Sequence, residues 1–292
     1  MPPVPRSSLD PARRLSGWLD RRVRDLPPGR RLRQLLALEL VERHAAGRDG
    51  ALTVLDAGCE EGLLCLELAR RHPGWRLVAA DLAAPALRRG RTWALEEGLA
   101  VSFVQLDVTQ SLGIAAYDVV LSLECLEEVP DDQAALHAMA TALRPGGLFV
   151  GHVPTADWSP VLKGAARTWR REVRHGYDPG ELRSRLEALG LGVLEVSPTF
   201  RRTTALAQDL RDACKTHRRR SRLLLPLMAG AVRLERAGLT WGPARGLLVV
   251  AVKPAGASTS GGPDPVGQAA AEPADPPSEG LHPQHEAALA PQ

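Results

Sequence analysis

Residues 53–62, with the sequence TVLDAGCEEG, decide the fold of this chain. The apolar run that leads into Asp56 predicts a strand, and the glycines after it let the backbone turn sharply and come into contact with a ligand. A helical pattern begins directly after the second glycine, and the free backbone N–H groups of a helix N-terminus suit polar or anionic ligand groups. The candidate ligand-binding residues of this loop are Asp56, Gly58, Cys59 and Gly62.

The alternation of strand and helix continues on the C-terminal side of this loop. Further apolar runs, most of them separated by helical patterns, occur at 75–81, 100–108, 117–124 and 148–154. Runs that are apolar on both faces predict a parallel sheet covered by helices. Two later runs, at 191–198 and 245–254, predict the remaining strands. We therefore expect an α/β fold with a doubly wound, mostly parallel, seven-stranded Rossmann-like sheet and helices on both faces.

The composition is that of an ordinary soluble globular protein, since 44% of the 292 residues are hydrophobic and 24% are charged. Only three of the 37 basic residues are lysine, so the arginine content looks like genomic base composition, and we expect no nucleic-acid partner. The four cysteines form no C-x-x-C pair, which predicts reduced thiols and no metal site. The first residues lack the apolar stretch of a secretory signal, so a cytoplasmic location is expected.

Two acidic residues close strands at the edge where open α/β sheets bind ligands. Asp81 comes 25 residues after Asp56, and a carboxylate at that strand end can accept hydrogen bonds from both hydroxyls of a ribose. Asp107 ends the third strand at the same edge and could accept from an adenine amino group. The alternatives are a helix N-cap for Asp81 and a turn-forming role for Asp107.

Five stretches in sequence order resemble the class I methyltransferases that act on small molecules. They are VLDAGCEEG, the strand that ends at Asp81, QLDV, YDVVLSLECLEEVPDD and LRPGGLFV. The likeness covers residues 50–200 and implies an S-adenosylmethionine-dependent methyltransferase with S-adenosylmethionine as its cofactor. Two positions depart from the family's pattern: Glu60 stands where a glycine is usual, and Glu128 stands where a histidine is usual. A side chain at Glu60 could crowd the cofactor or repel its carboxylate.

The resemblance also implies roles for individual residues of the cofactor site. Gly58 and Gly62 would line the methionine part of the cofactor, while Asp81 would hold its ribose. Leu82 would pack on the adenine ring, and the edge of that ring would be bound by Asp107 and Val108.

Methyl transfer needs alignment of the reactants and, for a weakly nucleophilic acceptor, the removal of a proton. Glu124, just after the fourth strand, would face the reacting sulfonium if the resemblance holds. The candidate bases are His152, which follows the fifth strand, and His175 with Tyr177, which precede the helix that usually borders the acceptor pocket. The alternative for each histidine is a surface or structural role.

The chain divides into three segments by composition. A flexible N-terminal segment over 1–28 precedes a methyltransferase domain over 29–254, which contains a helical, arginine-rich insertion over 200–244 before the last strand. Residues 255–292 form a Pro/Gly/Ala-rich acidic tail that is expected to be disordered. Within the insertion, residues 216–237 combine clustered arginines with an apolar block, so they could lie on an anionic membrane surface. The alternative is a helical lid over the substrate pocket.

Three functions are compatible with these patterns. The expected one is methyl transfer to a small-molecule, sugar or lipid-linked acceptor, with O-methylation favoured over N- or C-methylation. A nicotinamide-dependent oxidoreductase shares the sheet but requires G-x-G-x-x-G after its first strand, and that spacing is absent. A non-catalytic methyltransferase-like binding or assembly protein is the remaining alternative, supported by Glu60 and the missing histidine. The sequence does not indicate the oligomeric state.

Overall fold

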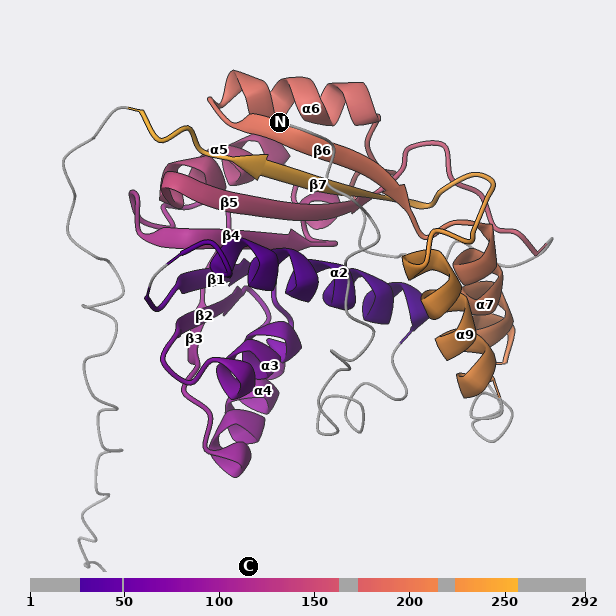
Figure 1. Ribbon diagram of the computed structural model, residues 1–292, viewed down its shortest axis with the longest axis horizontal. Coiled ribbons are helices and arrows are strands. Elements are labelled where there is room, and N and C mark those ends of the chain that lie inside the picture. The colour runs from indigo at the N-terminus through magenta and orange to yellow at the C-terminus, as the bar shows by residue number, and fades with distance from the viewer. Residues whose placement is uncertain (1–26, 49, 163–172, 215–223, 257–292) are drawn as a thin grey trace, which may run out of the picture.

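The computed structural model describes residues 27–48, 50–162, 173–214 and 224–256, and these form one seven-stranded sheet with helices around it (Figure 1). The strand order is β3-β2-β1-β4-β5-β7-β6, and β7 alone runs antiparallel to its neighbours. The strands are β1 (Thr53–Ala57), β2 (Arg76–Asp81), β3 (Ser102–Gln105), β4 (Tyr117–Leu123), β5 (Leu143–Pro154), β6 (Gly192–Thr199) and β7 (Gly246–Val252). The expected mostly parallel, seven-stranded Rossmann-like sheet is therefore confirmed.

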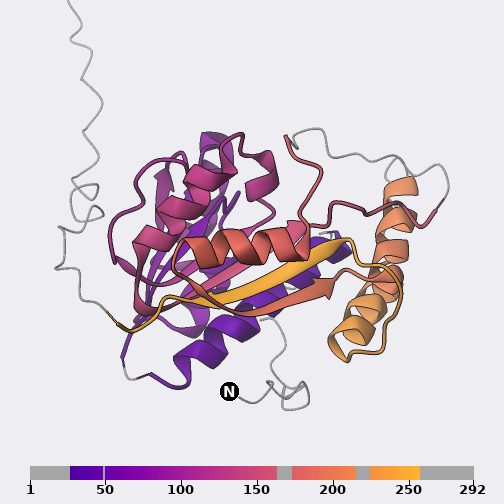
Figure 2. The same cartoon turned by 90° about the horizontal axis from the view of Figure 1, so that it is seen from above.

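Helices cover both faces of the sheet, as Figures 1 and 2 show. One face carries α2, α3 and α4, and the other carries α5 and α6. The helices are α2 (Pro28–Ala45), α3 (Leu63–Arg71), α4 (Ala84–Glu97), α5 (Asp132–Ala142), α6 (Pro179–Ala188), α7 (Arg202–Ala213) and α9 (Leu225–Arg236), with a 3-10 turn, η1 (Leu126–Glu128).

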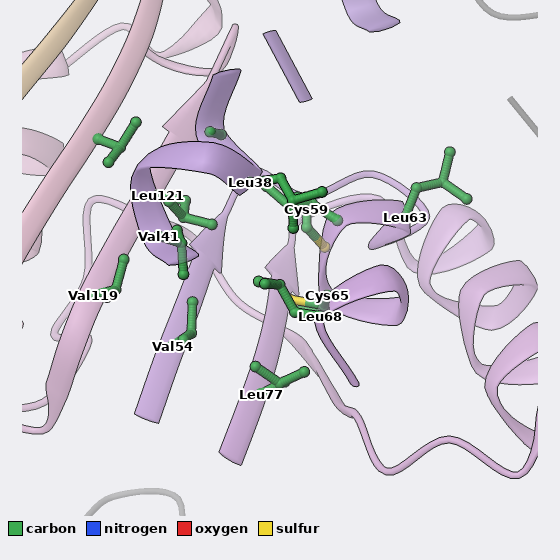
Figure 3. Close-up of a cluster of buried hydrophobic side chains, with 14 of the residues drawn as sticks. Leu38, Val41, Val54, Cys59, Leu63, Cys65, Leu68, Leu77, Val119 and Leu121 are labelled. Atoms are coloured by element: carbon green, nitrogen blue, oxygen red, sulfur yellow. The ribbon is translucent and has the colours of Figure 1, made fainter. Parts of the chain in front are cut away.

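Two hydrophobic cores separate the helices from the sheet. Side chains alternate across a strand, so the neighbours Val54 and Leu55 enter opposite cores. Figure 3 shows the core beneath α2 and α3, where Leu38 of α2 and Leu68 of α3 lie above Val54 and Leu77 of the sheet. The continuous apolar runs of the sequence are explained by this burial on both faces.

Strand β5 begins earlier than the sequence predicts. The Pro-Gly-Gly stretch at 145–147 predicts the end of a helix and a strand that starts at residue 148, but β5 already begins at Leu143. Its register against β4 shifts from Tyr117↔Leu143 to Val119↔Leu148, so the extra residues form a bulge. Gly146 has a φ of 78°, a conformation that glycine adopts without strain, and its N–H donates to the carbonyl of Lys253.

The expected helical insertion before the last strand contains α7 and α9 in its described part. These helices pack on each other and against α2 (Figure 1). Glu235 of α9 also accepts a hydrogen bond from the backbone N–H of Arg201, over 2.9 Å. The segments expected to be flexible at the N-terminus and disordered at the C-terminus lie outside the described residues, apart from 27–28 and 255–256.

Candidate active site

The carboxyl ends of β1, β2 and β4 bring three acidic side chains to one edge of the sheet. Asp56 is the residue before the last one of β1, Asp81 ends β2, and Glu124 directly follows β4. The predicted meeting of these strand ends is therefore observed. Asp56 and Glu124 line a cleft, here called the cofactor cleft, which is also lined by Gly58 of the loop and by the N-terminal part of α2. Asp81 lies behind the loop, where its Oδ2 accepts from the backbone N–H of Glu60.

Asp81 holds the glycine loop in place. Its Oδ2 accepts a hydrogen bond from the backbone N–H of Glu60 over 2.7 Å, and its Oδ1 accepts one from Ala83 over 2.7 Å. Each carboxylate oxygen has a second lone pair, so these two bonds leave Asp81 able to accept from two further donors. A local structural role and a ribose-binding role are therefore compatible.

The loop backbone requires glycine at the position of Gly58. Its φ is 80°, and a Cβ atom there would lie 2.4 Å from Sγ of Cys125. Glu60 adopts the same left-handed region, with a φ of 52°, which costs a residue with a side chain about 1 kcal/mol or more. Its carboxylate pairs with Arg30 over 2.7 Å.

Helix α2 contributes two arginines to the cofactor cleft. Arg30 pairs with Glu60 and also with Glu61, over 3.0 Å, so it ties the helix to the glycine loop. Arg33 lines the same cleft, and within the described part of the chain its guanidinium makes no hydrogen bond or ion pair. Burial lowers the pKa of Arg33, while the nearby carboxylate of Glu124 opposes that effect. Arg33 is thus a cation in the cleft without a direct partner.

A chain of three buried side chains crosses the sheet edge from β4 to β6. Nδ1 of His152 lies 2.7 Å from Oε1 of Glu124, and Nε2 lies 2.8 Å from Oγ1 of Thr199. Burial alone would raise the pKa of Glu124, but Arg33 and His152 outweigh it and hold that pKa below its usual range. An ionised Glu124 can only accept, so Nδ1 carries a proton. In the neutral ring Nε2 then has the free lone pair, to which the Thr199 hydroxyl donates.

Gly246 of β7 leaves the space that the imidazole occupies. A Cβ atom on this glycine would lie 2.6 Å from Cε1 and 2.8 Å from Nε2 of His152. The same atom would lie 3.0 Å from Oγ1 of Thr199. Contacts below 3.0 Å require a shift, so the position of the ring depends on this glycine.

A second cavity, here called the acceptor cavity, adjoins the cofactor cleft. It has a volume of about 250 Å³ and shares Arg30, Arg33, Glu60 and Glu124 with the cleft. His152 lines its floor, and the rest of its wall comes from the segment after β5, from α7 and from Arg245 just before β7. Its apolar lining residues are Pro27, Pro154, Trp158, Pro160 and Phe200.

This geometry can be compared with known proteins. A sequence profile described as "Methyltransferase domain" matches residues 23–196, more than half of the chain. The chain belongs to the class I S-adenosylmethionine-dependent methyltransferases. The resemblance found in the five sequence stretches is thereby confirmed, and the cofactor implied by it is the methyl donor of this family.

One relative is the ubiquinone biosynthesis O-methyltransferase of Erwinia tasmaniensis, which is 35% identical over 158 residues, covering 50% of this chain and 64% of the relative. This methyltransferase thus spans less than two thirds of that relative's length. Among solved structures, the [4+2]-cyclase SpnF matches with a TM-score of 0.55 and 20% identity over 75% of this chain and 82% of that one. The phosphoethanolamine N-methyltransferase 2 of Haemonchus contortus matches with a TM-score of 0.52 and 16% identity over 71% and 50%. At these identities the structures establish the fold alone.

The charged, polar and apolar side chains in and beside the cofactor cleft fit S-adenosylmethionine. Arg33, which has no direct partner among the described residues, offers a cation for the carboxylate of the methionine part, and Asp81 retains acceptor capacity for the ribose hydroxyls. Leu82 is 66% exposed directly after Asp81, so its side chain is available to pack on the adenine ring. These assignments, like those of Asp56, Gly58, Cys59 and Gly62, stay predictions.

The remaining cofactor candidates follow β3, which ends at Gln105 and not at Asp107 as the sequence suggested. Asp107 is exposed, and its Oδ1 accepts from both the backbone N–H and the hydroxyl of Thr109, over 2.9 and 2.8 Å. These bonds hold the pKa of Asp107 below its usual range and show the turn-forming role considered above. Val108 is buried beneath the turn. Their contact with adenine stays a prediction.

Of the three candidate bases, the structure brings His152 to the cavities and leaves the other two outside. His152 lies inside β5, two residues before its end, and not after the strand as the sequence suggested, because the strand extends to Pro154. His175 is exposed. Tyr177 is fully buried and donates to Oδ2 of Asp132 over 2.7 Å, and burial together with that carboxylate raises its pKa well above its usual value. Tyr177 therefore ties the segment before α6 to α5.

The sequence patterns do not indicate that the arginines of α2 reach the site, or which residues surround His152. Arg33 could have been noticed as a charged residue between leucines in an amphipathic helix. Thr199 and Gly246 carry no local signal, because they reach His152 only through the pairing of β7 with β5 and β6. Within the described residues, no group of histidine, cysteine or acidic side chains could hold a metal ion. No helix in the described ranges has the length and apolar character to cross a membrane.

Proposed function

We propose that this methyltransferase transfers the methyl group of S-adenosylmethionine to a hydroxyl group of a small-molecule acceptor. The observation that carries this proposal is the chain from Glu124 through His152 to Thr199 at the junction of the two cavities. An alcohol or phenol is a weak nucleophile until its proton is removed, whereas a neutral amine needs no base. A histidine with an oriented, unprotonated Nε2 therefore favours O-methylation.

The residues divide the work as follows. Glu124 accepts a hydrogen bond from Nδ1–H of His152 and so favours the neutral tautomer in which Nε2 is basic. The acceptor hydroxyl takes the place that the Thr199 hydroxyl has on Nε2, and its proton passes to that nitrogen. The bound cofactor supplies an electrophilic methyl group on a sulfonium. With the cofactor bound, the acceptor oxygen would take the methyl group and leave the sulfur as a neutral thioether. The proton lost by the acceptor would then rest on the imidazole of His152, beside Glu124.

The relatives support this choice of acceptor atom, since the matching protein of Erwinia tasmaniensis is named an O-methyltransferase. The acceptor cavity has a volume of about 250 Å³, which favours a compact acceptor or the compact end of a larger one. It is closed on one side by α7 and on another by α2.

The test uses the full chain, labelled S-adenosylmethionine and a matched pair of acceptors, 4-hydroxybenzamide and 4-aminobenzamide. We expect label in the hydroxyl compound. His152→Gln should lower that rate by about 100-fold or more, the usual contribution of a general base. His137→Gln on the exposed face of α5 is the matched control and should leave the rate unchanged. Transfer to the amine alone, or full activity of His152→Gln, would refute the proposal.

The non-catalytic alternative predicts a different result in the same experiment. A binding or assembly protein would bind S-adenosylhomocysteine without transferring label to any acceptor. Calorimetric titration with S-adenosylhomocysteine, carried out on the same preparation, separates a missing acceptor site from a missing cofactor site.

A further inference from the structure

The wall of the acceptor cavity that lies away from the cofactor cleft contains a buried ion pair. Arg245 donates from Nη1 and Nη2 to the two carboxylate oxygens of Asp209, each over 2.7 Å. Oδ2 of Asp209 also accepts from the backbone N–H groups of Val161 and Leu162, over 2.7 and 3.0 Å. The charges of this wall cancel, and its position is fixed by four hydrogen bonds.

Two aromatic rings flank the guanidinium of Arg245. Its Cζ lies 5.1 Å from the ring centre of Trp158 and 5.8 Å from that of Phe200. All three side chains line the acceptor cavity and are less than 9% exposed. The wall therefore has two aromatic rings around a neutralised cation, and aromatic rings pack well against another aromatic ring.

Two polar atoms of this wall are buried and lack a hydrogen-bond partner among the described residues, Nε of Arg245 and Oε1 of Gln208. The orientation of the Gln208 amide is fixed, because its Nε2 donates to Oδ2 of Asp212 over 2.9 Å and a carboxylate can only accept. The free atoms are thus one N–H donor and one carbonyl acceptor. Gln208 and Arg245 are 9% and 7% exposed, so both atoms are withheld from bulk water.

On the basis of the proposed function, we infer that Gln208 and Arg245 select an aromatic acceptor that carries an uncharged donor-and-acceptor group, such as a carboxamide or hydroxyl, away from the hydroxyl to be methylated. Such a group donates to Oε1 of Gln208 and accepts from Nε of Arg245. An anionic substituent would face the carboxylate of Asp209 and the carbonyl oxygen of Gln208. A cationic substituent would face the guanidinium of Arg245. A plain methyl substituent would leave both buried atoms unpaired.

The experiment measures the affinity of the S-adenosylhomocysteine-loaded full chain for three probes by calorimetric titration. They are 4-hydroxybenzamide, the anionic 4-hydroxybenzoate and 4-methylphenol, which share one ring and one hydroxyl. We expect the amide to bind about tenfold or more tightly than either of the others, because a site built for hydrogen bonding rejects analogues that cannot satisfy it. Equal affinities, a preference for the anion, or no binding of any probe would overturn the inference.

Gln208→Met keeps the length of the side chain and removes the acceptor oxygen. This variant should reduce the preference for the amide over the methylphenol to within about threefold, because the amide loses its acceptor and the methylphenol no longer leaves that oxygen unpaired. Gln133→Met, on the exposed face of α5, is the control and should keep the preference. A full preference in Gln208→Met would overturn the assignment.

The outcome for S-adenosylhomocysteine separates this inference from the proposed function. If the chain binds S-adenosylhomocysteine but shows no preference for the amide, the inferred selectivity is overturned and the cofactor site stands. A folded chain that does not bind S-adenosylhomocysteine overturns both.

Discussion

The backbone N–H of Glu60 donates to Oδ2 of Asp81 over 2.7 Å, so the carboxylate that closes β2 holds the loop that follows β1. The conformation of the loop therefore depends on Asp81, which is also the candidate for binding the ribose. Because Asp81 has acceptor capacity left on both oxygens, its replacement should affect the free protein and the cofactor complex in separable ways.

Asp81→Ala should weaken S-adenosylhomocysteine binding by roughly 1.5–3 kcal/mol for each charge-assisted hydrogen bond lost. It should also lower the melting temperature of the ligand-free protein, because Glu60 and Ala83 lose their acceptor. Asp81→Asn keeps one acceptor oxygen, so its affinity and its melting temperature should lie between those of the natural chain and those of Asp81→Ala. Calorimetric titration and thermal unfolding measure the two effects, and an unchanged affinity in Asp81→Ala would remove this residue from the site.

Glu60→Gly should bind S-adenosylhomocysteine as tightly as the natural chain or more tightly. The exchange removes the strain of a φ of 52° and releases Arg30 from its ion pair at the mouth of the cleft. Glu60→Ala loses the same ion pair but keeps the strain, so it should be less stable than Glu60→Gly by about 1 kcal/mol. Weaker binding by both variants would mean that the Glu60 carboxylate contacts the ligand itself.

Asp56 should make the protein less stable as the pH rises from about 4 to 7. Burial, followed by the charge of Asp81, raises its pKa from 3.8 to about 7. The native state therefore keeps a proton that the unfolded chain has released, and stability that is complete below the lower pKa is lost as pH rises through the upper one. Asp56→Asn cannot ionise, so its denaturant midpoint should vary less over this range. Parallel pH profiles for both chains would contradict the assignment.

Gly246→Ala should displace the imidazole of His152 and lower the rate of methyl transfer with little change in S-adenosylhomocysteine affinity. The added Cβ would lie 2.6 Å from Cε1 of that ring, and overpacking of this kind costs typically 1–3 kcal/mol of stability. Gly192→Ala in β6 is the matched control, since its Cβ would meet nothing closer than 3.7 Å. An active Gly246→Ala would show that the ring position is not critical.

Membrane contact through 216–237 stays a prediction, because 216–223 lie outside the described residues. The described part of this stretch presents Leu227 and Leu234 on one face of α9, and Leu239 and Trp241 follow it, 63% and 70% exposed. The double variant Leu227→Ser/Leu234→Ser, which changes two exposed residues inside this stretch, should co-sediment less with phosphatidylglycerol vesicles than the natural chain does. Leu194→Ser, exposed on β6, is the control. Equal sedimentation of all three chains would refute the contact.

The fold could be predicted from the sequence because its strands are buried on both faces and its turns are marked by glycine. The glycine loop, Asp81 and Glu124 all follow strands, so the meeting of their side chains follows from parallel pairing alone. The start of β5 could not be predicted, since Pro-Gly-Gly usually ends an element and here forms a bulge. Whether Asp107 closes a turn or binds a ligand could not be decided from the sequence either, because the same carboxylate can do both.

The surroundings of His152 could not be predicted, because they are brought together by strand order. Thr199 is 47 residues away from His152 in the sequence, and Gly246 comes later still. No periodicity or motif relates residues of β5, β6 and β7 across such distances. Arg33 escaped notice for another reason: in a helix sequence it has the same appearance as a solvated arginine.

The position of β7 between β5 and β6 has a consequence for synthesis of the chain. Among the strands of the described residues, β7 is synthesised last, and it joins β6 to the rest of the sheet. Until residues 246–252 emerge, β5 presents an unpaired apolar edge, which is open to pairing with other nascent chains. During synthesis each chain is therefore expected to expose the edge of β5, to which a chaperone could bind, until β7 pairs with that edge.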